Sequence, residues 1–144
     1  SRYINQNKDD YYRLIQAVRD QNSWEEWNLF ILEAIEQTSR QTIKLIKNMR
    51  DLMLHHKDKM RSEKPKIYSQ DLLNNLFRHP YTKIEFVEQE LQIHRHTARK
   101  YLKELVDIGL LEQHKIGVEN FYLNTELFEL LRNNGQIIEE KSCE

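Results

Sequence analysis

The residues of this sequence best suited to chemistry are the cations gathered near residue 100. No acidic residue lies between Leu91 and Glu104. When this segment is wound as an α-helix, residues spaced by three, four and seven positions share one face. One face is then apolar, with Ala98, Tyr101, Leu102 and Leu105. The start of the helix and its other face carry the residues that we predict to bind nucleic acid: Arg95, His96, Thr97, Arg99, Lys100 and Lys103.

Clustered cations of this kind attract phosphate groups, and an Arg near the start of a helix can also bond to the edge of a guanine base. A solvated helix surface with no ligand can carry the same charges. The neighbouring elements favour nucleic-acid binding, because they have the spacing of a helix-turn-helix motif.

Two short helices are predicted before the cationic one. Ser69 caps the first, which turns Leu72, Leu73, Leu76 and Phe77 inward. Thr82 and Glu85 form a capping box at the start of the second, which turns Phe86, Val87 and Leu91 inward.

A tight turn at residues 92–94 leads to the cationic helix, which is predicted over residues 95–108 and ended by Gly109 at its C′ position. A β-hairpin is then predicted, with strands at 110–115 and 120–123. This arrangement indicates a winged helix-turn-helix domain with a small β-hairpin wing.

The predicted wing is a weaker match to DNA binding than the helix. Lys115 is the phosphate contact that we expect from it. Its tip, residues 116–119 around Gly117, carries apolar residues and an acid where cations would be expected. Asn124 then caps a last helix that runs to Leu131.

Other kinds of site find little support. His94 and His96 lie two positions apart, so on a helix they point about 200° apart and cannot share a metal ion. His55 and His56 are adjacent and equally unsuitable, and the single cysteine, Cys143, offers no zinc site. We therefore predict no catalytic residue and no metal ligand in this chain.

The first half of the chain is predicted to be helical. Asn7 can cap a first helix, and Ser23 with Glu26 forms a capping box at the start of a second. No Gly or Pro interrupts the second helix from Trp24 to about Met60. Its length would be roughly 55 Å at ~1.5 Å per residue.

The long helix has two kinds of apolar surface. Its first part is apolar on several sides, and we expect a homodimer interface there, formed by Trp24, Trp27, Phe30 and Ile31. A single stripe follows, which packs either within this chain or against a second chain: Thr42, Leu45, Ile46, Met49, Leu52 and Met53.

The fold class predicted is mainly α, with a long-helix segment at 1–61, a charged linker at 62–66, the winged helix-turn-helix domain at 67–132 and a flexible tail at 133–144. The 144 residues, 31% of them charged, include no apolar run long enough to span a membrane. The single Cys143 favours a cytoplasmic location. Because the chain opens at Ser1 rather than Met, we expect it to be part of a longer polypeptide.

Two stretches resemble the Fic (Fic/DOC) family of bacterial proteins. The string at 91–112, Leu-Gln-Ile-His-Arg-His-Thr-Ala-Arg-Lys-Tyr-Leu-Lys-Glu-Leu-Val-Asp-Ile-Gly-Leu-Leu-Glu, resembles the winged-helix tail of many of its members. Residues 1–19, followed by Trp-Glu-Glu-Trp at 24–27, resemble what comes after the Fic active site. The resemblance covers nearly the whole chain.

The resemblance implies a parent protein that transfers AMP from ATP to a protein hydroxyl. The family's motif, His-Pro-Phe-x-x-Gly-Asn-Gly-Arg, is absent from this sequence. His79 and Pro80 look like its opening, but no glycine follows to bind a phosphate, and we interpret them as a helix stop. ATP and Mg²⁺ are therefore expected only for the full-length parent, whose catalytic core would be a partner within the same polypeptide.

The sequence thus favours a regulatory module that binds double-stranded DNA, without a membrane partner. The alternative is a protein–protein interaction or dimerisation module that positions substrate for the AMP-transferring domain of the parent. The cationic helix favours the first function, and the weak wing favours the second.

Overall fold

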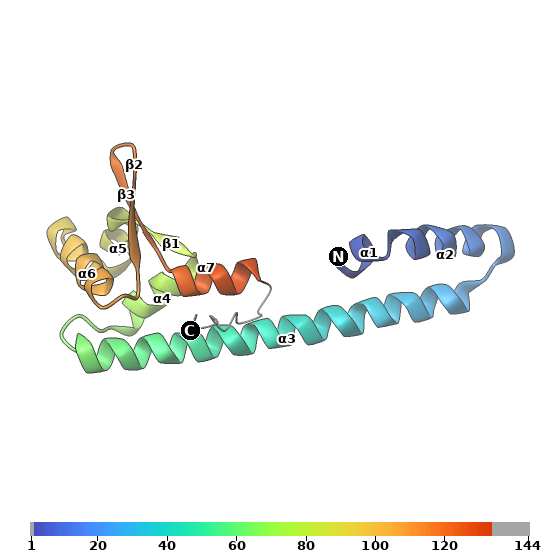
Figure 1. Cartoon of the computed structure of the whole chain (residues 1–144), viewed down its shortest axis with the longest axis horizontal. Helices are drawn as coiled ribbons and strands as arrows, with labels where there is room; N and C mark the ends of the chain where they lie inside the picture. The colour runs from blue at the N-terminus through green and yellow to red at the C-terminus, as the bar shows by residue number, and fades with distance from the viewer. Residues whose placement is uncertain (1, 134–144) are drawn as a thin grey trace, which may run out of the picture. The chain divides into compact units, whose positions relative to one another are not determined.

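The computed structural model describes residues 2–133, so Cys143 and all but the first residue of the predicted tail at 133–144 lie outside the described residues. The described part is mainly helical and has one small antiparallel sheet (Figure 1). It divides into two compact units, with the boundary between Ile46 and Lys47. The division falls inside helix α3 (Trp24–Glu63), and the last two residues of this helix belong to the stretch predicted as a linker, 62–66.

The first unit contains α1 (Arg2–Gln6), α2 (Lys8–Gln21) and the first part of α3. Helix α2 ends where Asn22 adopts the left-handed conformation, at φ 56°. Phe30 of α3 is buried under the rings of Tyr3 and Tyr11, whose centroids lie 5.4 and 6.5 Å from its own.

The predicted cap at Asn7 is wrong in its chemistry. Asn7 does stand at the N-cap position of α2, but its side chain makes no capping hydrogen bond there. Its Nδ2 instead donates to the carbonyl of Tyr3, at 2.8 Å. The competing partner is thus a carbonyl of α1, a five-residue helix that the sequence did not reveal.

The second unit begins in the last part of α3. Its further elements are α4 (Gln70–Arg78), β1 (Tyr81–Thr82), α5 (Ile84–Leu91), α6 (Arg95–Asp107), β2 (Glu112–Ile116), β3 (Glu119–Leu123) and α7 (Thr125–Arg132). The strands lie in the order β1-β3-β2. Both pairings are antiparallel, and Tyr122 of β3 lies between Thr82 of β1 and Gln113 of β2.

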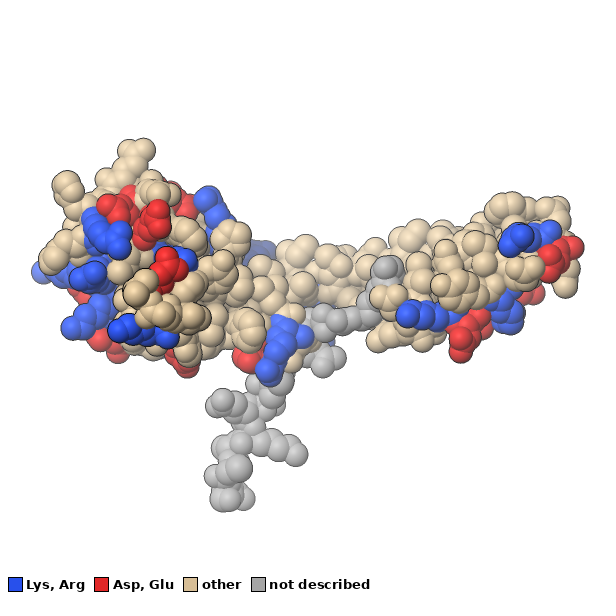
Figure 2. Space-filling view, turned by 90° about the horizontal axis from the view of Figure 1, so that it is seen from above, with Lys and Arg blue, Asp and Glu red and all other residues tan. Residues whose placement is uncertain are grey.

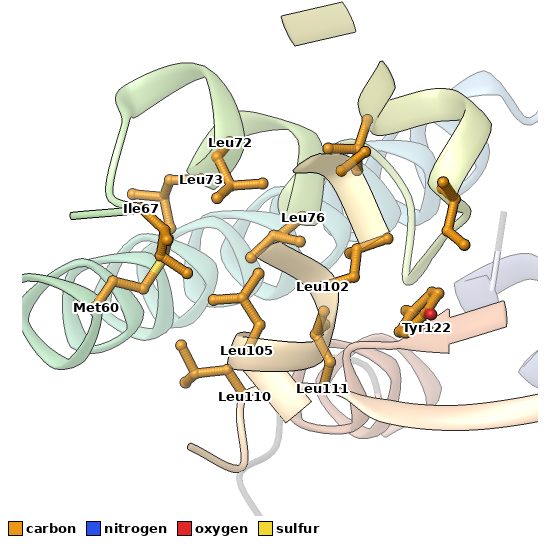
Figure 3. Packing of buried hydrophobic residues seen from close by; sticks show 13 residues of the cluster. Met60, Ile67, Leu72, Leu73, Leu76, Leu102, Leu105, Leu110, Leu111 and Tyr122 are labelled. Atoms are coloured by element: carbon orange, nitrogen blue, oxygen red, sulfur yellow. The ribbon is translucent and has the colours of Figure 1, made fainter. Parts of the chain in front are cut away.

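The core of the second unit joins its helices to the base of the hairpin (Figure 3). Met60 of α3 is fully buried in it. Figure 3 shows the side chains that converge there from α3, α4, α6, β3 and the connecting segments, among them Met60, Ile67, Leu72, Leu76, Leu102, Leu105, Leu110 and Tyr122. This core fixes α6 against the sheet.

Local capping sets the ends of these elements. The Ser69 hydroxyl accepts a hydrogen bond from the N–H of Leu72 at 3.1 Å, which confirms the predicted cap of α4. The predicted capping box at Thr82 is wrong, because α5 begins one residue later and Lys83 holds the N-cap position. Thr82 is buried in β1, and its hydroxyl donates to Oδ1 of Asn75 at 2.8 Å.

Gly109 ends α6 as predicted, with φ at +71°. Its N–H donates to the carbonyl of Val106 at 2.9 Å, and the N–H of Leu110 donates to that of Leu105 at 3.0 Å. These two bonds form a Schellman motif. Leu110 and Leu111 are consequently drawn into the core, and β2 starts at Glu112 rather than at residue 110.

Candidate nucleic-acid interface

Two helices joined by a short turn position the cationic face. Helix α5 ends at Leu91. Gln92 at its C-cap takes the left-handed conformation at φ 52° and has its N–H bonded to the carbonyl of Glu88. His94 then returns to extended backbone and stands at the N-cap position of α6. Val87 of α5 and Ala98 of α6 are both fully buried, so the small Ala98 side chain faces the core.

The predicted binding residues of α6 lie on its outer side. All of them are exposed except Thr97, which is half-buried: Arg95, His96, Arg99, Lys100 and Lys103. Figure 2 shows blue side chains gathered over this unit, with red ones between them. The face is therefore accessible, but acidic groups share the surface.

Ion pairs divide the cations of α6 into two sets. Arg95 reaches a carboxylate oxygen of Glu88 at 3.8 Å, and Lys100 reaches Glu104 at 3.9 Å. Glu104 also lies 3.5 Å from the ammonium group of Lys64. The sequence could not reveal the contacts of Glu88 with Arg95 and of Lys64 with Glu104, because Glu88 and Lys64 lie outside α6.

Arg99, Lys103 and Lys115 form the second set. Within residues 2–133, no carboxylate lies within 4.0 Å of the charged nitrogens of these three side chains. Arg99 and Lys103 are four residues apart, so they share one side of the helix. These two cations are the ones most available to a phosphate.

The electrostatics of Tyr122 connect α6 to the sheet. Burial of this side chain raises the pKa of its hydroxyl above the usual 10.0, and the positive charge of Arg99 opposes the rise. Arg99 is thus close enough to β3 to act on Tyr122.

The hairpin presents both a cation and apolar groups. Lys115 is exposed and pairs with Asn120 across the two strands. At the tip, Ile116 is 64% exposed and Val118 96% exposed, with Gly117 between them at φ +61°. The tip of the hairpin therefore exposes two apolar side chains to solvent.

The acid near the tip of the hairpin, Glu119, forms an ion pair within the chain. A carboxylate oxygen of Glu119 lies 2.6 Å from the ammonium group of Lys83. The same ammonium group stands 4.4 Å from the ring centroid of Phe121, in cation–π geometry. Glu119 therefore repels a phosphate less than the sequence suggests.

The residues predicted as a dimer interface are placed differently from one another. Phe30 is 9% exposed and is covered within its own unit, and Trp27 and Ile31 are half-buried. Trp24 is 52% exposed. Other apolar residues of α3 are more accessible: Leu29, Leu32, Ile35, Ile43 and Ile46.

Residues 79–86 do not form a phosphate-binding loop. Helix α4 ends at Arg78, as the predicted helix stop requires, and His79 takes an extended conformation. The ring of His79 stacks on that of Tyr81, with centroids 6.3 Å apart, and the backbone enters β1. No glycine occurs in the stretch, so these residues do not fit the phosphates of ATP.

The described residues offer neither a cluster of metal ligands nor a membrane-spanning helix. They contain no group of three or more His, Cys, Asp or Glu side chains that could hold a metal ion. None of the helices in residues 2–133 has the length and apolar character needed to cross a membrane.

These features define the class of the protein as a mainly helical one with a small antiparallel sheet and an exposed cationic helix. Residues 52–127, more than half of the chain, match the family described as "Protein adenylyltransferase SoFic-like, C-terminal domain". The chain belongs to this family, which confirms the predicted relationship to the C-terminal portion of Fic proteins.

Proposed function

We propose that residues 67–132 form a winged helix-turn-helix module that binds double-stranded DNA. In this proposal α5 and α6 are the two helices of the motif, α6 is the recognition helix, and β2 with β3 is the wing. The order of these elements supports the assignment. The observation that carries the proposal is the pair of exposed cations on α6, Arg99 and Lys103, that no carboxylate neutralises.

The cations of the surface have different roles in this proposal. Arg99, Lys103 and Lys115 contact phosphates, because they have no ion pair to lose. Lys100 and Arg95 contribute less, since each must first leave an acid at 3.9 or 3.8 Å. Three to five contacts predict that log affinity falls with log salt concentration at a slope between about −2.7 and about −4.5.

The test is a titration of a labelled duplex at several salt concentrations. Replacing Arg99 and Lys103 by Ala should weaken binding at least about tenfold and make the salt slope shallower by about two. The matched control replaces Lys44 and Arg50, two exposed cations of α3, and should leave both quantities unchanged. Equal affinity for the two double variants, or no binding by the wild type at low salt, would contradict the proposal.

A second candidate function is protein–protein interaction, and the wing tip favours it. Ile116 and Val118 are strongly exposed, and a partner protein that covered them would remove their apolar surface from water. A module that binds a substrate protein could use this tip to position the substrate for AMP transfer. This function would be selected by two results together. The wild type would not bind DNA, and substitutions at the wing tip would abolish binding of a defined substrate protein.

We infer that the module regulates a longer, cytoplasmic Fic-type protein. The family description, which concerns the C-terminal domain of a protein adenylyltransferase, supports this inference. ATP and Mg²⁺ would then be held by the catalytic core of that parent. The residues of the present chain take no part in the transfer step.

A further inference from the structure

One face of α3 in the first unit is apolar and uncovered. Leu29 is 60% exposed, Leu32 61%, Ile43 53% and Ile46 59%. These exposed fractions are large for branched aliphatic side chains on one helix, because removing aliphatic surface from water lowers the free energy. Phe30 lies on a different side of α3, which Tyr3 of α1 and Tyr11 of α2 cover.

The exposed residues follow a coiled-coil repeat. Positions 29, 32, 36, 39, 43 and 46 alternate in steps of three and four, as the a and d positions of successive heptads do. Four of the six are aliphatic, and the two in the middle are Glu36 and Ser39. Polar residues at central seam positions weaken a coiled coil but fix its register.

The repeat is complementary to itself when a second copy runs in the opposite direction. With the centre between positions 37 and 38, Leu29 lies opposite Ile46 of the second copy, and Leu32 lies opposite Ile43. Glu36 lies opposite Ser39, so each polar residue meets the other rather than an aliphatic side chain. An antiparallel pair therefore buries all four aliphatic residues of both copies.

The charges beside the seam select the same direction. Glu26 and Glu33 precede the centre, and Arg40 and Lys47 follow it, all at the e position of the repeat. In an antiparallel pair these positions face one another, so Glu26 meets Lys47 of the second copy and Glu33 meets Arg40. In a parallel pair, each of these four residues would instead lie level with the same residue of the second copy.

The contacts within the chain leave these charges free to exchange partners. Arg40 pairs with Glu36 at 2.7 Å, and Arg13 reaches Glu26 at 3.9 Å. The side chains of Arg40 and Glu26 are 77% and 64% exposed. Solvent-exposed ion pairs contribute little to stability, so an apolar seam can rearrange them.

We propose that α3 pairs with α3 of a second copy of this chain as an antiparallel coiled coil, with residues 29–46 in the seam. The proposal is independent of DNA binding. It also moves the dimer contact away from Trp27 and Phe30, which serve the fold of the unit itself.

Two charge-reversal variants and their mixture test the proposal by sedimentation. The variant Glu26→Lys with Glu33→Lys has only cations beside the seam, and the variant Arg40→Glu with Lys47→Glu has only acids. We expect the wild type to dimerise at micromolar concentration and each variant alone to dimerise at least tenfold more weakly. An equimolar mixture should form heterodimers, because every flanking pair is again of opposite charge.

A control variant separates the seam from general charge effects. Lys8→Glu with Lys44→Glu changes two exposed cations outside the seam and should dimerise like the wild type. Helix content measured by circular dichroism should be the same for all variants, because the changed side chains are exposed. A wild type that stays monomeric at high micromolar concentration would overturn the proposal and leave the face to another partner, such as an adenylyltransferase core. A mixture that stays monomeric while the wild type dimerises would overturn it too.

Discussion

His56 is a buried titratable side chain whose surroundings oppose its charge. It is 0% exposed, and its ring meets that of Phe77 edge to face, with centroids 5.2 Å apart. Its Nε2 lies 3.0 Å from a carboxylate oxygen of Glu126, while Nδ1 has no hydrogen-bond partner among the described residues. Burial lowers the pKa of His56 below 6.5, and the carboxylate of Glu126 opposes that shift without reversing it.

The lowered pKa predicts a loss of stability in acid. The unfolded chain takes up a proton on His56 near pH 6.5, whereas the folded chain takes it up only at lower pH. Between these two values the unfolded state binds more protons, so the free energy of unfolding falls as the pH drops. Urea titrations from pH 8 to pH 5 should show this fall, and His56→Leu should reduce it. The exposed His96 is the control, and an equal effect of His96→Gln would contradict the assignment.

Some ion pairs of single residues could not be predicted from the sequence. The types of Arg99 and Lys100 are equally favourable for phosphate binding, but only the structure shows that Lys100 shares Glu104 with Lys64. The contact of Lys83 with Glu119 joins residues 36 positions apart. Such contacts depend on the fold as a whole, and no local pattern predicts them.

Helices were predictable where their signals are local. Periodic apolar residues and the caps Ser69, Gly109 and Asn124 lie within a few positions of the elements that they define. The two-residue strand β1 has no such signal, because it exists through pairing with β3. That pairing also takes Thr82 out of its expected capping box.

The caps of α4 and α7 should differ in their contribution to stability. Asn124 is 1% exposed and accepts a hydrogen bond from the N–H of Leu127, while its Nδ2 donates to the carbonyl of Leu76. Ser69 makes a capping bond alone. Ser69→Ala should cost about 1 kcal/mol, and Asn124→Ala should cost about 2–3 kcal/mol because it also removes the donor to Leu76. Chemical denaturation measures both, and equal losses would mean that the bond to Leu76 contributes nothing.

At the scale of the whole molecule, the long helix serves two units. The sequence placed a boundary at 62–66, where charge and a proline favour a linker. The structure divides the chain near Lys47, because the last part of α3 contributes Met60 to the core of the second unit. The sequence left open whether the apolar stripe of the long helix packs within the chain or against another chain. Met53 of this stripe packs against the core of the second unit.

The division predicts which fragments can fold. A fragment of residues 47–133 keeps the fully buried Met60 and His56, and it should unfold in one cooperative transition. A fragment of residues 67–133 keeps every helix and strand of the predicted winged domain but loses both side chains. It should be destabilised by at least the cost of Met60→Ala in the full chain, which is about 2–5 kcal/mol for a buried methionine. Urea denaturation of the two fragments and of the Met60→Ala chain measures these quantities. Equal stability of the two fragments would show that the end of α3 only lies against residues 67–133 and does not complete their core.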